Sequence, residues 1–543
     1  MAHLFEINEK LHYGLILLDA LARAYPTEEN ISLQSVSQKT GFISESYLEE
    51  VAAKLREGDL VTGARGRTGG YRLTKDPSEI TMEQIVTAVD GPIALVECQT
   101  ASAPPCPVGN HCASKQAWQK IQDTLVRALR GMTLTDLVQK NSTISHRPLY
   151  LDHAATTPLD PRVFEAMQPY FMEIYGNPSS FHTPGKRAKD AMDESRSKIA
   201  NILACQPEEI LFSSGGTESD NLAILGFARA NQEHGKHIVT TTIEHHAVLE
   251  AVTYLERKEG FRVTRVPVDK DGVINSTDVL AAIQPDTILV SVMLANNEIG
   301  TIQPVSEIGN ALRKQRGSGL YPVLHTDACQ AAGALSLDVE KLHVDLLTLN
   351  GSKIYGPKGI GALYLKKGLK IRPLQFGGSQ ERGLRPGTEN VAAIIGLGTA
   401  LEIAQQEIRK ENARLIPLRD KLLQGILEHI PKTRHNGHPT KRLPNNVNIS
   451  FLDLEGEALL LYLDAQGIFA STGSACASAS LDPSHVILAL GVPFEVAHGS
   501  IRFTLGRSTT EMDIDRVLEI LPPLVEKLRS LSPVRVNEKY FAL

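Results

Sequence analysis

The chain has 543 residues, of which 42% are hydrophobic and 22% are charged, and its formal net charge is −6. This length predicts a globular protein of three or four structural units. The weak negative charge gives no global signal for nucleic acid, so such a site would need a local basic patch. No run of about 18 uncharged apolar residues occurs, which predicts that no segment spans a membrane.

The first 25 residues are partly apolar, but Glu6, Glu9, Asp19 and Arg23 interrupt them at helical spacing. This pattern predicts an amphipathic helix rather than an export signal. Without export, disulfides are not expected, and the six cysteines are interpreted as metal ligands, nucleophiles or core residues. We therefore expect a cytoplasmic protein.

The first part of the chain alternates short helices with one strand-turn-strand. A break at Gly41 between two helices, the second capped by Ser44, predicts a helix-turn-helix. LVTGARGRTGGYRLT (60–74) predicts a wing, and the polar stretch 139–148 predicts a linker. The predicted helices cover residues 10–24, 32–39, 44–57, 81–89 and 113–130, the last with the only tryptophan, Trp118.

From Leu149 onward, short β-branched runs alternate with longer helical patterns. This alternation is typical of an α/β fold whose mostly parallel sheet is connected by crossover helices. From about residue 405, longer helices and fewer strands predict a smaller second lobe. The predicted strands lie within residues 209–214, 236–242, 262–268, 287–293, 321–328, 346–353 and 361–365.

Four motifs in this part suggest one pocket. SSGGTESDN predicts a strand-to-helix turn that could bind a phosphate, and TIEHHAVLE places a histidine pair after a strand. HTDACQAAG puts Asp327 at a strand's carboxyl end, where it could hold a pyridine nitrogen. NGSKIYGPKG surrounds Lys353 with small residues, as a Schiff-base lysine requires. Each motif alone could be a turn, a cap or a surface lysine, but their order favours a fold-type I site for pyridoxal phosphate (PLP).

Residues 149–533 resemble the cysteine desulfurases of the iron–sulfur assembly type. The resemblance implies a PLP-dependent transferase of fold-type I, with a mostly parallel seven-stranded sheet in a large domain and a smaller α+β domain. It implies a homodimer that converts L-cysteine to L-alanine and passes sulfur to a scaffold protein or another acceptor. The matching stretches include YLDHAATTPLDPRV, SSGGTESDN, TIEHHAV, NNEIG, HTDACQ, KIYGPKGIGALY, ERGLRPGT, STGSACASASLDPS and SIRFTLGR.

The resemblance also implies the roles of single residues. Cys476 would be the nucleophile that carries the persulfide, Lys353 would hold PLP covalently and move the α-proton, and His245 would stack on the ring. Arg502 would bind the substrate carboxylate. The other implied contacts are Gly216 and Thr217 at the phosphate, Asn297 at cofactor and substrate, Asp327 at the pyridine nitrogen, Gln330 at the phenolic oxygen, Asn350, Ser352, and Thr388 at the other subunit's phosphate.

The neighbours of Cys476 support its role independently, because the small residues of GSACASAS suit an accessible thiol, whereas Cys205 lies in the apolar run NILAC. Asn350 and Ser352 stand where the family usually has serine and histidine, and both can still donate hydrogen bonds, so we expect PLP to bind. Cys329 replaces a common threonine and is interpreted as a core residue rather than a redox group. The short C-terminal tail leaves the sulfur acceptor open.

Residues 4–130 resemble the iron–sulfur-cluster regulator family of winged-helix repressors. The matching stretches are KLHYGLILLDALA, SESYLEEVAAKLREGDLVTGARGRTGGYRL, ITMEQIVTAVDG and a three-cysteine loop. The resemblance implies a [2Fe–2S] cluster, or a [4Fe–4S] cluster, on Cys98, Cys106 and Cys112, whose state changes DNA binding. A Pro- and Gly-rich C-x7-C-x5-C loop lets three thiolates converge. Zinc would favour two closer pairs, and three unrelated thiols are the other alternative.

The fourth cluster ligand is not in its usual place. Some relatives have a histidine three residues after the third cysteine, but this chain has Lys115, which is not a cluster ligand. Other relatives take the ligand from the first helix of the partner subunit, and the matching residue is His12. We therefore predict that His12 of one protomer completes the cluster of the other, with His111 as the alternative.

DNA binding is less clearly indicated. Ser46 and Tyr47 on the recognition helix and Arg65 and Arg67 on the wing are the candidate DNA contacts. The same helix carries three glutamates, which repel phosphate or mark a solvated face, although glutamate can also read cytosine. They are Glu45, Glu49 and Glu50.

The leading interpretation is a cysteine desulfurase fused to its own cluster-sensing domain. One alternative is a transcription regulator that uses the PLP half as a ligand sensor without turnover, but Cys476, Lys353 and Arg502 argue against it. The other is a desulfurase whose first domain only holds a cluster or docks partners. The predicted domains are 1–138 with the cluster loop 98–112, the linker 139–148, and 149–543, which divides into a large domain (161–404) and a small one (149–160 plus 405–543).

Overall fold

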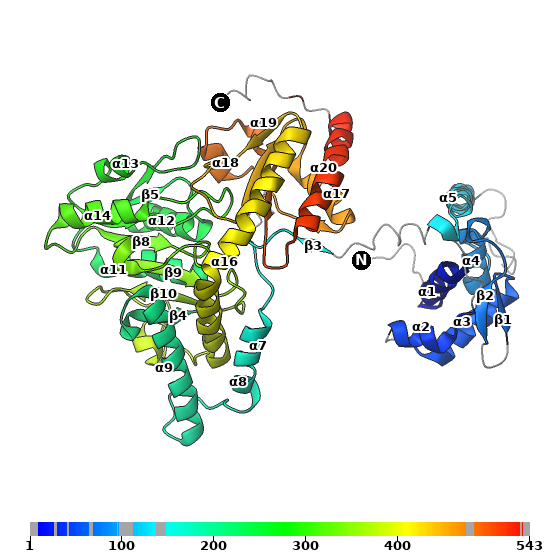
Figure 1. The fold of residues 1–543 in the computed structure, drawn as a ribbon, viewed down its shortest axis with the longest axis horizontal. Helices are drawn as coiled ribbons and strands as arrows, with labels where there is room; N and C mark the ends of the chain where they lie inside the picture. The colour runs from blue at the N-terminus through cyan, green and yellow to red at the C-terminus, as the bar shows by residue number, and fades with distance from the viewer. Residues whose placement is uncertain are drawn as a thin grey trace. The chain divides into compact units, whose positions relative to one another are not determined.

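The computed structural model describes residues 9–25, 30–40, 43–64, 69–94, 96, 112–136, 148–473, 483–532 and 535. The chain forms two compact units, Met1–Arg147 and Pro148–Leu543 (Figure 1). Of the predicted linker, 139–148, only Pro148 is described. Among the described helices, none is both long enough and apolar enough to cross a membrane.

The first unit is a winged helix, as predicted. Ser44 caps the second helix of the helix-turn-helix, where its hydroxyl accepts a hydrogen bond from the Tyr47 N–H at 3.3 Å. The wing strands pair antiparallel, with Val61 opposite Leu73. The elements are α1 (Glu9–Ala24), α2 (Leu33–Thr40), α3 (Glu45–Glu57), β1 (Val61–Ala64), β2 (Gly70–Leu73), α4 (Met82–Asp90) and α5 (Ala113–Arg130).

Helix α5 differs from the other helices of this unit because its described side chains are not buried. From Trp118 to Arg130 every side chain is half-buried or exposed, and Ile121 is 45% exposed. By contrast, Leu17, Leu48 and Leu55 on α1 and α3 are fully buried in the core. Because its apolar side is only partly covered, this amphipathic helix is suited to contact a second chain.

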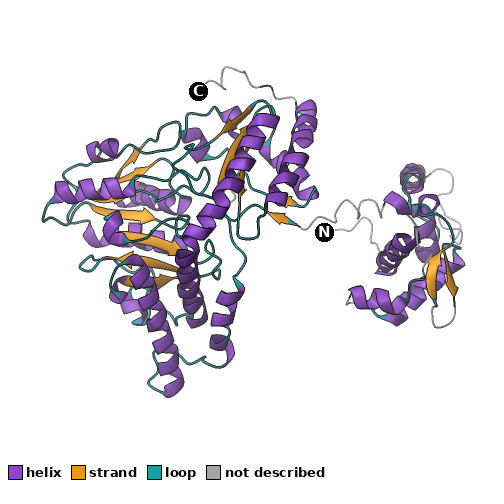
Figure 2. Ribbon diagram, viewed as in Figure 1, coloured by secondary structure: helices purple, strands orange, loops and turns teal. Residues whose placement is uncertain are grey.

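A seven-stranded sheet forms the centre of the second unit. Its order is β4-β10-β9-β8-β7-β5-β6, with β10 antiparallel to both neighbours and the other pairs parallel. Helices cover the sheet (Figure 2), which confirms the predicted α/β fold. All seven predicted strands are present: β4 (Ile210–Ser213), β5 (His237–Thr241), β6 (Arg262–Val266), β7 (Thr287–Ser291), β8 (Val323–Asp327), β9 (Leu346–Asn350) and β10 (Gly361–Leu365).

The helices of this half follow the crossover pattern. They are α7 (Pro161–Met167), α8 (Pro169–Met172), α9 (Thr183–Leu203), α10 (Gly216–Asn221), a π-helical turn (Leu222–Gly226), α11 (Phe227–Asn231), α12 (His246–Glu259), α13 (Ser276–Ala281), α14 (Val305–Arg316) and α15 (Val339–Leu342).

A single long helix, α16 (Val391–His429), joins the large and small lobes (Figure 1). Its residues up to Ala404 pack into the core under the large sheet, and those from Leu415 pack into a second core. The predicted boundary at 404/405 therefore falls inside a continuous helix. The small lobe contains β11 (Thr433–His435), β12 (Asn446–Phe451), α17 (Gly456–Ala465), β13 (Ile468–Phe469), α18 (His485–Ala489), α19 (Phe494–Ala497), β14 (Ser500–Thr504) and α20 (Glu511–Leu531).

The beginning of the second unit is built into the small lobe. Strand β3 (Leu149–Tyr150) pairs in parallel with β13, so that Leu149 lies opposite Ile468. Asp152, two residues after the end of β3, forms a β-bridge to Thr504 at the end of β14. This pairing brings the first residues of the unit to the edge of the large sheet where the parallel strands end.

Candidate active site

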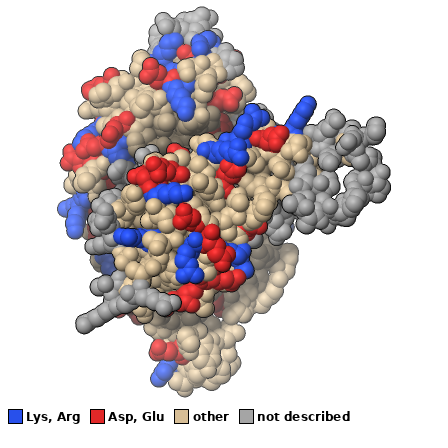
Figure 3. All heavy atoms as spheres, turned by 90° about the vertical axis from the view of Figure 1, so that its right-hand side faces the viewer, with Lys and Arg blue, Asp and Glu red and all other residues tan. Residues whose placement is uncertain are grey.

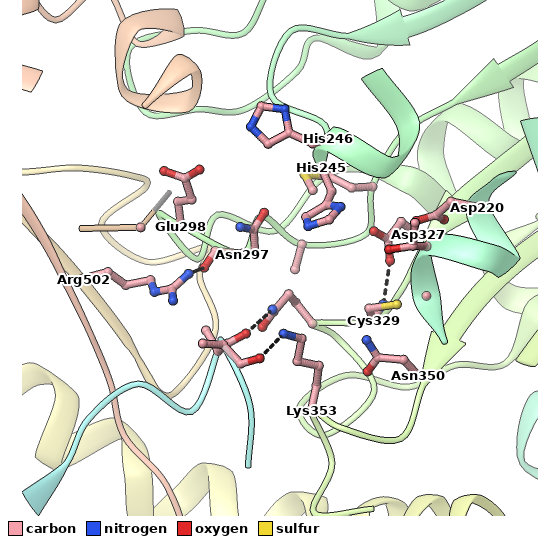
Figure 4. A pocket seen from close by; sticks show the side chains of 18 of the residues that line it. Asp220, His245, His246, Asn297, Glu298, Asp327, Cys329, Asn350, Lys353 and Arg502 are labelled. Atoms are coloured by element: carbon pink, nitrogen blue, oxygen red, sulfur yellow. Dashed lines mark hydrogen bonds between the residues drawn. The ribbon is translucent and has the colours of Figure 1, made fainter. Parts of the chain in front are cut away.

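The parallel strands end around a cavity of about 380 Å³, a volume in the range of small-molecule sites. Asp327 is the last residue of β8 and Asn350 the last of β9, while His245 follows β5 and caps α12. Figure 4 shows these side chains converging on one space. The predicted residues that line it are Gly216, Thr217, His245, Asn297, Asp327, Gln330, Asn350, Lys353 and Arg502.

Lys353 reaches across the cavity to the start of the unit. Its Nζ donates to the carbonyl oxygen of Ala155 at 2.5 Å, and the Gln330 amide donates to the carbonyl of Ala154 at 2.9 Å. Residues 154 and 155 thus form one wall of the cavity. Lys353 lies opposite Asp327. Three of the eight residues that follow Lys353 are glycines, so the lysine amine is held in the cavity without being packed into the core.

The pocket fits PLP by the chemistry of its donors. Gly216 and Thr217 begin a helical run that continues through α11, so free backbone N–H groups point to a phosphate position. A methyl group on Gly216 would lie 2.9 Å from Cys329 Sγ, so this approach requires glycine. Asn350 Oδ1 is buried without a hydrogen-bond partner among the described residues, which leaves it available to a bound group. These residues would hold PLP, which when bound supplies an electron sink.

His245 is neutral at physiological pH. Its Nδ1 accepts a hydrogen bond from the Ala247 N–H at 3.1 Å. Burial lowers the pKa of His245, and the nearby Lys353 charge lowers it further, while Asp327 opposes this shift. An uncharged imidazole over the cavity can stack on a flat ring and still exchange a proton.

Buried carboxyl groups beneath Asp327 were not predicted. Burial and the Asp327 charge raise the pKa of Asp220 well above its usual value, and burial lowers the pKa of His325 to about 4. His325 Nε2 lies 3.6 Å from Asp220 Oδ1. Burial also raises the pKa of Glu244 to about 8. Burial therefore disfavours the charged form of each of these three groups near Asp327.

On the other side of the cavity, the small lobe supplies Arg502 (Figure 4). Asn446, at the start of β12, donates to the Glu298 carbonyl at 3.1 Å. Arg502 Nη1 donates to the carbonyl of Asn297 at 2.9 Å. Glu298, 3% exposed, accepts a hydrogen bond from Ser484 Oγ at 2.5 Å. A methyl group on Gly473, where φ is 93°, would lie 2.9 Å from the Glu298 carboxylate. Glu298 was missed because its motif, NNEIG, gives no local sign of a carboxylate facing a pocket.

Several predicted residues lie elsewhere. Ser352 does not line the cavity, and its carbonyl accepts a hydrogen bond from the Thr157 N–H at 2.9 Å. Thr388 is exposed in the segment before α16, where it could reach another subunit. Cys476, Cys98, Cys106, His111, Arg65 and Arg67 lie outside the described residues.

The described cysteines differ in their surroundings. Burial raises the pKa of the Cys205 thiol to about 12, and burial raises that of the Cys329 thiol well above its usual value. Both are therefore protonated and poor nucleophiles at neutral pH. Cys112 is half-buried at the N-cap of α5, and its side chain makes no capping hydrogen bond.

The two described candidate cluster ligands lie on different helices of the first unit. His12 is exposed on α1, and Cys112 begins α5. Among the described residues, no group of three or more potential ligands is placed to bind a metal ion. Ser46 is exposed on α3, whereas Tyr47 is half-buried with its ring edge-on to Tyr13 at 5.3 Å.

Comparisons with known proteins agree with this geometry. Residues 149–517 match the family model for class-V aminotransferases, and residues 7–140 match that for an iron-dependent transcriptional regulator. The chain is 53% identical to the cysteine desulfurase IscS of Methanosarcina thermophila over 75% of this chain and 99% of that protein. The chain belongs to the cysteine desulfurase family. This confirms the family and enzyme class that the sequence predicted.

Three further relatives have lower sequence identity to the chain. The rat cysteine desulfurase is 47% identical over 72% of this chain and 85% of its own length. A solved NifS-like protein is 38% identical with a TM-score of 0.66, covering 70% of this chain and all of its own. A structure described as SspA in complex with cysteine is 35% identical with a TM-score of 0.57, covering 66% and 98% of the two chains.

We predict that Glu244→Gln removes a pH dependence from the stability of the desulfurase half. Wild-type Glu244 binds its proton up to a pKa of about 8 when folded but only to 4.5 when unfolded. Its stabilising contribution is therefore present below 4.5 and is lost as pH rises to about 8. As pH rises through this window, the unfolding free energy of wild type should fall relative to that of Glu244→Gln by roughly 1.4 kcal/mol per pH unit.

Urea unfolding followed by circular dichroism at pH 5.5, 6.5 and 7.5 measures this difference. Asp286→Asn is the control, because Asp286 is 40% exposed and pairs with Arg262 at the surface. A constant difference between Glu244→Gln and wild type over these three pH values contradicts the prediction.

Proposed function

We propose that the chain converts L-cysteine to L-alanine with the help of PLP and retains the sulfur as a persulfide on Cys476. The convergence of Lys353, Asp327 and Arg502 on one cavity carries this proposal. A covalent cofactor anchor, a partner for a pyridine nitrogen and a carboxylate binder are what an amino-acid substrate of a PLP enzyme requires. The names of the relatives support the same substrate.

The roles of the chain's own residues follow from this arrangement. Arg502 and Asn297 orient the substrate through its carboxylate, and Lys353 takes the proton from its α-carbon. The Cys476 thiolate attacks the substrate sulfur, so that an S–S bond forms as the C–S bond breaks. The electron pair of the C–S bond stays on the β-carbon, which takes up a proton. Lys353 returns its proton to the α-carbon, and L-alanine leaves. The persulfide then passes to a scaffold protein or another sulfur acceptor.

Purified holoenzyme should form one L-alanine per L-cysteine consumed and release sulfide when a thiol reductant is present. Cys476→Ser should lower the rate of alanine formation by about a thousandfold or more, because no other thiolate replaces the nucleophile. Cys205→Ala serves as the matched thiol control and should keep the wild-type rate. If the protein binds PLP but wild type forms no alanine, the ligand-sensor alternative is favoured instead.

We also propose that the protein is a cytoplasmic homodimer. Thr388 is exposed and so can reach the phosphate position of another subunit. Large apolar side chains cluster in the segment after α7, where a second copy would cover them: Phe171 is 58% exposed, Met172 81% and Tyr175 75%. The partly covered apolar side of α5 provides a second contact of the same kind. A reducing compartment keeps the thiols available.

The N-terminal unit, we propose, holds a [2Fe–2S] cluster on Cys98, Cys106 and Cys112, with His12 of the partner protomer as fourth ligand. Cys112 is described, and its thiol is not engaged in capping α5. The exposed position of His12 on α1 leaves its imidazole able to reach another chain. Three thiolates and one imidazole form a ligand set of the type that iron–sulfur clusters accept.

His12→Ala should change the visible absorption and circular dichroism of the reconstituted cluster. Its lifetime in air should fall by about tenfold or more, because a ligand position is lost. His111→Ala tests the alternative ligand and should behave like wild type. An unchanged spectrum and lifetime in His12→Ala would falsify the assignment.

The family model of the first unit also supports DNA binding, which we propose for α3 and the wing. Ser46 on α3 is exposed to solvent, whereas Tyr47 is half-buried and packs on Tyr13. Lys10 pairs with Glu50 at 2.5 Å, which reduces the repulsion of phosphate by α3. Acidic and basic side chains are interspersed on the face in Figure 3, so a DNA site depends on a few local cations.

Replacing both Arg65 and Arg67 by alanine should weaken binding to DNA from upstream of the protein's own gene. The slope of log affinity against log salt should become shallower by about two, since each lost phosphate contact releases one fewer counterion. Arg130→Ala is the control for the loss of an arginine outside the wing, because Arg130 pairs with Glu83. Fluorescence anisotropy at several salt concentrations gives the slope. An unchanged slope would show that the wing does not contact phosphate.

A further inference from the structure

Arg502, the predicted carboxylate binder, is already paired with a carboxylate of this chain. It lies in β14, is 2% exposed and lines the cavity (Figure 4). Its Nη2 donates to Asp152 Oδ1 at 2.6 Å, and its Nη1 donates to the Asn297 carbonyl at 2.9 Å. Its Nε is buried without a hydrogen-bond partner among the described residues. The guanidinium therefore has donors left, but its charge is already neutralised.

Asp152 cannot easily leave this position. The backbone N–H of Thr504 donates to the Leu151 carbonyl at 2.7 Å, and the segment that carries Asp152 pairs with the end of β14. The side chains of the pair are 3% exposed for Arg502 and 17% for Asp152. A short contact between weakly solvated charges on a paired backbone is a persistent ion pair, unlike a mobile pair at the surface.

An ion pair at this point changes how the cavity attracts anions. A substrate carboxylate that approaches Arg502 meets a cation whose field is largely cancelled by Asp152, and the two carboxylates repel each other. Binding then depends on the remaining donors of the guanidinium and on its geometry. The same cancellation weakens the binding of the product carboxylate and of inorganic anions, which favours turnover over retention.

We propose that Asp152 is a positioning residue that acts as the internal counter-ion of Arg502 and lowers the affinity of the site for amino-acid carboxylates. This inference rests on the proposed function, because it takes Arg502 as the carboxylate site. Asp152 orients the guanidinium for L-cysteine and limits the affinity for L-alanine, so that the product is released. Asp152 lies 350 residues from Arg502 in the chain, and only the pairing of β3 with the small lobe brings them together.

Asp152→Asn tests the charge, because asparagine keeps the shape and an oxygen that accepts the hydrogen bond. The probe is L-alanine, titrated into the holoenzyme and followed by the absorption of the bound cofactor, which requires no turnover. The dissociation constant of L-alanine and the KM of L-cysteine should each fall about five- to tenfold. Sulfate should compete with L-alanine more strongly by a similar factor. The value of kcat should stay constant or fall, because the product leaves more slowly.

Cysteamine, which lacks the carboxylate, is the matched ligand and should bind wild type and Asp152→Asn equally. Asp152→Glu keeps the charge and should stay close to wild type. Asp286→Asn changes net charge equally on a surface pair and should have no effect. Asp152→Ser, a second neutral variant, repeats the test if the asparagine variant does not fold.

L-alanine binding that is unchanged or weaker in the folded neutral variants overturns the proposal. So does a gain for cysteamine equal to that for L-alanine, because the effect would then not act through the carboxylate. A failure of the proposed function would be recognised by a different result. Wild type would then form no alanine from L-cysteine, whatever the L-alanine affinities of the variants.

Discussion

Asp327 carries its carboxylate at the end of a strand whose five residues are all buried, where an uncompensated charge is costly. Among the described residues, none of the ion pairs includes it, and its Oδ1 accepts a hydrogen bond from the Cys329 N–H at 2.9 Å. Beneath it, burial raises the pKa of Glu244 to about 8 and that of Asp220 well above its usual value, and burial lowers the pKa of His325 to about 4. A cation on the cavity side would stabilise the Asp327 carboxylate, and a protonated pyridine nitrogen meets this need.

The small lobe supplies the opposite charge. Arg502 lies on β14, and Asn446 and Asn448 on neighbouring β12 donate to the Glu298 carbonyl at 3.1 Å each. These contacts fix the loop that bears Asn297 to the small lobe. Because α16 passes without a break from one core to the other, one continuous helix links the lobe that carries Arg502 to the lobe that carries Asp327.

Local patterns were sufficient for the strands and for the residues at their ends, because parallel strands place their carboxyl ends at one edge. They were insufficient where the chain folds back over long distances. Nothing near Asp152 in sequence indicates Arg502, and the raised pKa of Asp220 on α10 depends on burial and on Asp327 at the end of β8. The predicted lobe boundary near residue 405 lies between the two cores, which end at Ala404 and begin at Leu415 on α16, although the helix itself continues through it.

The six cysteines fall into two classes, and the division suits a chain that handles sulfur. Cys329 is buried and Cys205 is half-buried, and burial raises the pKa of both thiols, so both stay protonated at neutral pH. Cys476 and the three cysteines of the loop at 98–112 lie among small residues, glycine or proline instead. Thiolate chemistry needs access and an ordinary or lowered pKa. The proposed persulfide formation and cluster binding thus fall in two segments, each in its own unit of the chain.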